Sequence, residues 1–139
     1  MKPGKAQNKQ QNIKIGRLGE DIALKFLEQK GLSLIQQNYR KPFAEIDIIC
    51  RNGNMVHFVE VKTVSYETKA QLDYAVTHET WRPEEQVHAF KLKQISKGVE
   101  TWLCEKHYKG NFQIDVVAVR VVPRETYASV KLIENVIFD

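Results

Sequence analysis

The sequence has few cysteines, no long apolar run and no acidic residue near its start. Its two cysteines, Cys50 and Cys104, match no metal-binding spacing, and we interpret both as small core residues. No segment approaches the roughly 20 apolar residues of a membrane span, and the basic first 20 residues lack the apolar stretch of a secretory signal. These absences argue against a disulfide framework, a membrane partner and export. They predict a cytoplasmic protein.

The positive charge is confined to one end of the chain. The 139 residues contain 21 Lys and Arg against 17 Asp and Glu, for a net charge of +4. All 17 acids follow residue 19, whereas residues 1–19 hold five cations, so the remainder has a net charge of −1. Residues 1–14 are predicted to be a flexible basic tail, either a phosphate-binding arm or a solvated terminus. Residues 15–139 are predicted to form one domain.

The hydrophobic pattern alternates between helical and extended segments. Helices are predicted over residues 15–30 and 88–107, and strands over residues 32–39, 45–51, 55–62, 112–122 and 130–138. A long loop is predicted over residues 63–86. This order, α-β-β-β-α-β-β, indicates an α/β fold in which helices flank a mixed sheet.

The two strands around Asn52-Gly53 are predicted to form a hairpin. If these two residues make a type I′ turn, opposed residue numbers sum to 105, whereas a turn at Gly53-Asn54 gives a sum of 107 and places Asp47 opposite Glu60. In both registers alternation places Glu45, Asp47, Ile49, Val56, Phe58, Glu60 and Lys62 on one face, and Ile46, Ile48, His57, Val59 and Val61 on the other.

Three carboxylates and one ammonium therefore gather at one end of a strand face. The first helix, whose apolar arc contains Glu20, is the predicted cover of that face. Two carboxylates about 5 Å apart at an effective dielectric of about 20 repel by roughly 3 kcal/mol. Either the acids take up protons, or a divalent cation lies between them. Oxygen ligands without His or Cys favour Mg²⁺, for which Mn²⁺ can substitute.

An isolated Glu-x-Lys on a strand is most often a solvated ion pair. Around Glu60 and Lys62 the neighbours are apolar on both faces, which indicates a buried strand where charge is costly. A metal held by Asp47 and Glu60 would polarise a phosphoryl oxygen, and Lys62 would orient water or offset charge on the phosphate. This combination suits phosphodiester hydrolysis.

Five short segments in order resemble the YraN-like bacterial family. They are Gly16-x-x-Gly19-Glu20-x-x-Ala23, Asn38-x-Arg40, Glu45-Ile46-Asp47-Ile48-Ile49, Phe58-Val59-Glu60-Val61-Lys62-Thr63 and Ile114-Asp115-Val116-Val117-x-Val119, with Lys91 between the last two. That family is similar to PD-(D/E)-x-K nucleases, which have the restriction-endonuclease-like fold of Holliday-junction resolvases.

The resemblance implies a site of four catalytic residues, Glu20, Asp47, Glu60 and Lys62. It implies that Asp47, Glu60, Glu20 and the Val61 carbonyl bind Mg²⁺ or Mn²⁺, and that Lys91 contacts nucleic acid. Arg40 can pair with Glu45 or meet phosphate, and Asp115 can support the site or simply begin its strand.

The aromatic residues of the long loop, Tyr66, Tyr74 and Trp81, can stack on bases or dock the loop or a second subunit. The function predicted from the sequence is metal-dependent hydrolysis of nucleic acid, DNA first, including branched intermediates, by a monomer or a homodimer. The rivals are a non-catalytic nucleic-acid-binding module and an assembly protein with the same fold.

Overall fold

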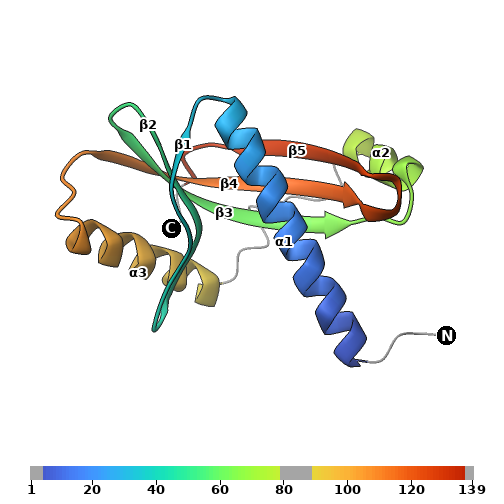
Figure 1. The fold of residues 1–139 in the computed structure, drawn as a ribbon, viewed down its shortest axis with the longest axis horizontal. Helices are drawn as coiled ribbons and strands as arrows, with labels where there is room; N and C mark the ends of the chain where they lie inside the picture. Colours follow the sequence, from blue (N-terminus) through green and yellow to red (C-terminus); the bar gives the residue numbers. More distant parts are fainter. Residues whose placement is uncertain (1–4, 79–88, 137–139) are drawn as a thin grey trace.

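A computed structural model of the chain describes residues 5–78 and 89–136 (Figure 1). Its elements are α1 (Lys5–Gln29), β1 (Ser33–Lys41), β2 (Ala44–Asn52), β3 (Met55–Ser65), α2 (Lys69–His78), α3 (Ala89–Glu105), β4 (Asn111–Val122), the short 3-10 helix η2 (Pro123–Glu125) and β5 (Tyr127–Ile133). The sheet runs in the order β1-β2-β3-β4-β5. Only β3 and β4 are parallel, because α2 and α3 form the crossover between them. The predicted mixed α/β fold is confirmed.

Helices cover both faces of the sheet, α1 on one and α3 on the other (Figure 1). Alternation along the strands supplies two apolar layers. Ala23 and Leu27 of α1 pack on Ile48, Val59 and Val117 of the sheet. On the other face, α3 contributes Ile95, Val99 and Trp102, which pack on strand residues Tyr39, Ile46, Ile49, Val56 and Phe58. Strands β2 and β3 are therefore buried on both faces.

The predicted face assignment needs two corrections. The strand face that holds Ile49, Val56 and Phe58 is covered by α3, whereas the prediction placed the first helix over it. Ile46 packs with Ile49 although alternation assigns it to the opposite face. The change of face occurs where regular pairing between β2 and β3 ends at Ile48, and the neighbouring strand β1 has a positive φ of 51° at Asn38.

Several boundaries also differ from the prediction. Helix α1 begins at Lys5, so residues 5–14 are helical, not a flexible tail. The predicted loop contains the last residues of β3 and the helix α2. Its residues 79–86 lie outside the described residues. Strand β5 begins at Tyr127 and ends at Ile133, and residues 137–138 of the predicted strand are not described. Cys50 is buried as predicted, but Cys104 is exposed.

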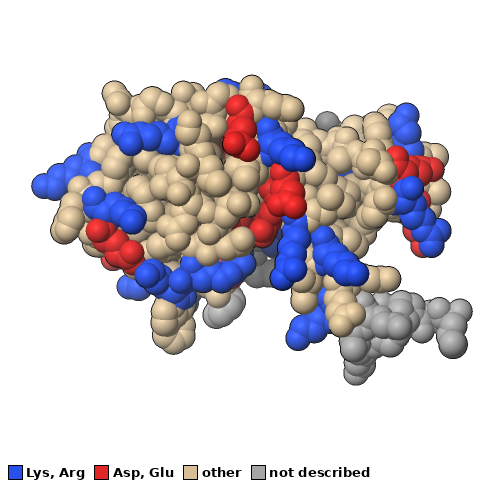
Figure 2. All heavy atoms as spheres, viewed as in Figure 1, with Lys and Arg blue, Asp and Glu red and all other residues tan. Residues whose placement is uncertain are grey.

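In residues 5–78 and 89–136, no helix has the length and apolar character needed to cross a membrane. Acidic and basic side chains are interspersed on the face that α1 crosses, so this face is not uniformly basic (Figure 2).

Candidate functional site

The hairpin of β2 and β3 opens at the point where its carboxylates lie. The pairing runs from Asn52 opposite Met55 to Ile48 opposite Val59, which is the register whose residue numbers sum to 107. The turn is therefore Gly53-Asn54, and Gly53 has a positive φ of 58°, as the first central residue of a type II′ turn requires. Beyond Ile48 the strands no longer pair, and the Val61 N–H donates to Asp47 Oδ2 at 2.8 Å.

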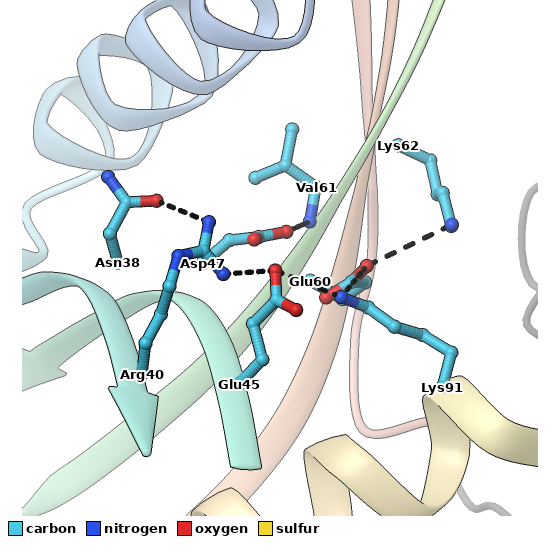
Figure 3. A network of polar contacts seen from close by, with 8 residues as sticks. All are labelled: Asn38, Arg40, Glu45, Asp47, Glu60, Val61, Lys62 and Lys91. Atoms are coloured by element: carbon cyan, nitrogen blue, oxygen red, sulfur yellow. Dashed lines mark hydrogen bonds and ion pairs between the residues drawn. The ribbon is translucent and has the colours of Figure 1, made fainter. Parts of the chain in front are cut away.

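The side chains meet in a hollow of about 380 Å³ between the two helical layers. Its lining includes Glu20, Asp47, Glu60, Val61, Lys62 and Lys91. Glu20 comes from α1 and Lys91 from α3, which cover opposite faces of the sheet, so the hollow is lined from both faces where the pairing of β2 and β3 ends. Figure 3 shows Lys91 extending from α3 toward Glu60. Gly19 makes this approach of α1 possible, because any Cβ there would overlap the Thr63 side chain of β3.

Lysines surround the buried Glu60 carboxylate, which is 3% exposed. Lys91 Nζ lies 3.5 Å from Glu60 Oε1 and 3.3 Å from Glu45 Oε1, and Lys62 Nζ lies 3.9 Å from Glu60 Oε1. Arg40 pairs with Glu45, one of the two partners predicted for it, and its contact with phosphate stays a prediction (Figure 3). Each cation beside the hollow is thus engaged with a carboxylate.

Glu60 is nevertheless incompletely satisfied. Its second oxygen, Oε2, is buried and has no hydrogen-bond partner among the described residues. Burial, and then the Asp47 charge, raises the pKa of Glu60 to about 8, although Lys91 and Lys62 oppose the shift. Without a further cation, this carboxyl group therefore holds a proton at neutral pH.

The other two acids respond differently to the same surroundings. Burial and the charge of Asp47 raise the pKa of Glu20, against the opposing effects of Arg40 and Asn38. Burial also raises the pKa of Glu45, but its bond with Arg40 and the charge of Lys91 outweigh burial and hold that pKa below its ordinary value. The electrostatic strain of the site is therefore concentrated at Glu60 and Glu20.

The donor set fits a hard divalent cation. Asp47, Glu60 and the Val61 carbonyl offer only oxygen ligands, and the unpartnered Glu60 Oε2 is the atom that a cation would satisfy. Within the described residues, no group of three His, Cys, Asp or Glu side chains is arranged to hold a metal. Two carboxylates plus water suffice for Mg²⁺, which retains several waters when protein-bound. Glu20 lines the same hollow, and its predicted role as a further ligand stays a prediction.

The structure does not bring Asp115 to this hollow. Its carboxylate lies 2.6 Å from His57 Nδ1 and accepts hydrogen bonds from Gln113 Nε2 at 2.8 Å and from the Asn135 N–H at 2.9 Å. Asp115 shares a face with Val117 and Val119 beneath α1, beside a separate hollow near Leu27 and Leu132. Of the two alternatives for Asp115, the structure therefore shows an acid bound within its own cluster and outside the lining of the candidate site.

Sequence reasoning assigned no role to Asn38. Its side-chain oxygen accepts a hydrogen bond from Arg40 at 3.2 Å, and its side chain also hydrogen-bonds Glu20. The available signal was an asparagine inside a strand pattern, since Asn tolerates positive φ better than most residues. Asn38 thus joins α1 to the Arg40 side of the site (Figure 3).

Comparison with known proteins gives a consistent match. The model of uncharacterised protein family UPF0102 matches residues 19–119. A UPF0102 protein of Campylobacter jejuni is 34% identical over 105 residues, covering 76% of this chain and 82% of the relative. The UPF0102 proteins of Dictyoglomus turgidum and Syntrophotalea carbinolica are 33% and 35% identical over 114 and 111 residues, covering 81% and 79% of this chain and 87% and 81% of the relatives.

Proposed function

The chain belongs to uncharacterised protein family UPF0102, the predicted YraN-like family, and we propose that it is a metal-dependent nuclease that hydrolyses phosphodiester bonds in nucleic acid, with DNA as the first candidate. The observation that carries the proposal is the buried Glu60 oxygen without a partner, beside Asp47 and within reach of two lysines. A purely structural acid at this depth would have its hydrogen bonds satisfied.

Asp47, Glu60 and the Val61 carbonyl would hold Mg²⁺ or Mn²⁺, and when bound this ion supplies a Lewis acid for a phosphoryl oxygen and lowers the pKa of its water. The Val61 N–H fixes the Asp47 carboxylate in its orientation. Lys62, which is 29% exposed, places its ammonium at the mouth of the hollow, where it orients water and offsets charge on the phosphate.

Lys91 and Glu20 complete the surroundings from opposite sides. Lys91 bridges Glu45 and Glu60, so it holds the acids together and limits their repulsion. Glu20 lines the hollow from α1, where burial and the charge of Asp47 raise its pKa.

The direct test is a nuclease assay in which Mg²⁺ or Mn²⁺ is titrated against branched, single-stranded and duplex substrates. We expect cleavage that depends on the metal and is lost in Glu60→Gln, whereas the exposed-surface variant Lys109→Ala cleaves like the wild type. Cleavage that persists in the Glu60→Gln variant would show that another protein or another site is responsible.

Metal binding is tested separately by thermal unfolding with and without Mn²⁺. A cation that binds only the folded state raises Tm, and we expect this rise in the wild type but not in Asp47→Asn. An equal rise in both proteins would contradict the assigned ligands whatever the activity.

A non-catalytic binding module is the second candidate, and one observation favours it. Lys91 already lies close to both Glu45 and Glu60, so its ammonium can replace a metal as the compensating charge. This alternative predicts nucleic-acid binding without cleavage, and no Tm response to Mn²⁺.

A further inference from the structure

A second hollow, of about 500 Å³, adjoins the candidate site and differs from it in charge. The two hollows share Ile15 of α1 and Ser65 of β3. The site is lined by three acids and two lysines, whereas the second hollow is lined by Lys14 and Arg124 with Glu67 as its single acid. The second hollow therefore has a net positive lining, which attracts a phosphate.

The cations of the second hollow are available for a ligand. Arg40, Lys62 and Lys91 around the site are all engaged by carboxylates. Lys14 and Arg124 are exposed, and neither forms an ion pair with any residue in the described ranges. Because α1 contains no acid before Glu20, the helix adds only positive charge where its first half extends past the sheet (Figure 1).

The hollow also contains an aromatic ring in a fixed position. Tyr66 follows β3 directly, and its N–H donates to the Val121 carbonyl at 2.8 Å, so the backbone beneath the ring is anchored to β4. Its ring is half-buried and stacks on no other ring of the described residues. Tyr74, by contrast, stacks on His78 at 3.8 Å, and Trp81 lies outside the described residues.

We propose that this second hollow binds single-stranded nucleic acid on its way to the candidate site, with phosphates at Lys14 and Arg124 and an unstacked base against Tyr66. That the bound strand leads to the candidate site rests on the proposed function. A duplex keeps its bases stacked and paired, so only a single strand can offer a base face to a ring inside a hollow. Glu60 and Tyr66 are six residues apart, which corresponds to about 20 Å along an extended strand. That length accommodates several nucleotides.

The test measures binding of a fluorescent oligothymidylate of about 12 nucleotides in the presence of a metal chelator. Chelation separates binding from hydrolysis, so this result stands whether or not the protein cleaves. Oligouridylate tests whether RNA binds as DNA does. A duplex of equal length tests the requirement for a single strand, and an abasic strand lacks the base that would stack on Tyr66.

The phosphate contacts are read from the salt dependence of binding. Each phosphate contact on a single strand contributes about 0.7 to the slope of log K against log salt. The double variant Lys14→Ala/Arg124→Ala should therefore have a slope shallower by about 1.4. The matched control Lys25→Ala/Lys109→Ala removes the same charge from exposed positions away from the hollow and should keep the wild-type slope.

The stacking contact is tested by measuring the affinity of Tyr66 variants for oligothymidylate. We expect Tyr66→Ala and Tyr66→Leu to bind oligothymidylate about tenfold more weakly, while Tyr66→Phe stays close to the wild type. Affinity for the abasic strand should be the same in all four proteins. Equal affinity for the duplex, an unchanged slope in the double variant or no effect of Tyr66→Leu would overturn the proposal. Cleavage accompanied by any of these results would leave the nuclease function standing.

Discussion

Asp47 and Asp115 stand in nearly the same local sequence and have opposite roles in the structure. Asp47 lies between two isoleucines in β2, and Asp115 lies between Ile114 and Val116 in β4. Both are buried. Asp115 accepts hydrogen bonds from a side-chain amide and a backbone N–H and contacts His57, whereas Asp47 lies beside Glu60, whose Oε2 lacks a partner in the described part of the chain.

The difference separates an acid whose hydrogen bonds are filled by the protein from one that we propose to bind a cation. A buried carboxylate whose lone pairs are filled by the protein stabilises the fold and has no capacity left for a ligand. A cluster that leaves a buried oxygen unfilled is costly to the fold and retains a place for a cation. Four predictions test this contrast.

The largest effect is expected on catalysis. Asp47→Asn should lower the rate of metal-dependent cleavage by about a thousandfold, in the range seen when one preorganised charge-stabilising group is removed. Asp115→Asn should leave the rate per folded molecule within about threefold of the wild type. The measurement is single-turnover cleavage with the folded fraction determined by circular dichroism. A comparable loss in both variants would abolish the distinction.

The next effect concerns stability, where the Asp115 variant should lose more than a variant of the candidate site. Asp115→Ala leaves His57, Gln113 and the Asn135 N–H without their acceptor, and we expect the free energy of unfolding to fall by about 3 kcal/mol. At pH 7 without metal the Glu60 carboxyl group is protonated and neutral, so Glu60→Gln exchanges one neutral group for another and its stability should stay close to that of the wild type. Urea unfolding in a chelator at pH 7 compares the two. A larger loss in Glu60→Gln would contradict the assignment.

The third effect is the pH dependence of stability without metal. The folded-state pKa of Glu60 is about 8, against an ordinary value of 4.5. Between these two pH values the unfolded chain loses a proton that the folded protein keeps, so stability should fall as pH rises. The slope contributed by one group is at most about 1.4 kcal/mol per pH unit. Urea unfolding from pH 5 to 8 should show this slope in the wild type, and Glu60→Gln should lack it.

The smallest effect is expected at the contact that holds α1 against β3. Gly19→Ala introduces a Cβ that overlaps Thr63, so the helix must shift, at a cost of about 1 kcal/mol. Gly16→Ala meets open space and should stabilise α1 slightly. Because Glu20 adjoins Gly19, the first variant should also weaken cleavage while leaving the Asp115 cluster intact. Thermal unfolding and cleavage assays of both variants provide the comparison.

The sequence predicted the hairpin and the convergence of its acids, because strand alternation and a two-residue turn are local properties. Asp47, Glu60 and Lys62 required no knowledge of distant contacts. The sequence leaves the position of the turn open, since Asn52-Gly53 suits a type I′ turn and Gly53-Asn54 a type II′ turn, and the structure has the second. Both registers keep the acids on one face.

The remaining features depended on tertiary contacts that no local pattern contains. The position of Asp115 follows from the parallel register of β4 against β3, which is fixed only when the crossover is complete. The cover of the Phe58 face by α3 follows from the path of the crossover between β3 and β4, and Glu20 reaches the hollow from α1 on the other face. The helical form of residues 5–14 is a further case, because their polar composition gives no amphipathic signal.

The short turn between β2 and β3 also orders the events of folding. Hairpins close in about 1–10 μs, whereas β3 can meet β4 only after residues 66–110 have been looped out, at a larger entropic cost. Asp47 and Glu60 can therefore approach each other before Lys91, which lies within that crossover, arrives to offset their charge. In a nascent hairpin with both acids ionised, the Asp47 and Glu60 carboxylates repel each other at the open end. Folding should consequently be faster when these two carboxyl groups are protonated. The same pair of acids that is proposed to bind a cation in the folded protein therefore slows the folding of the chain.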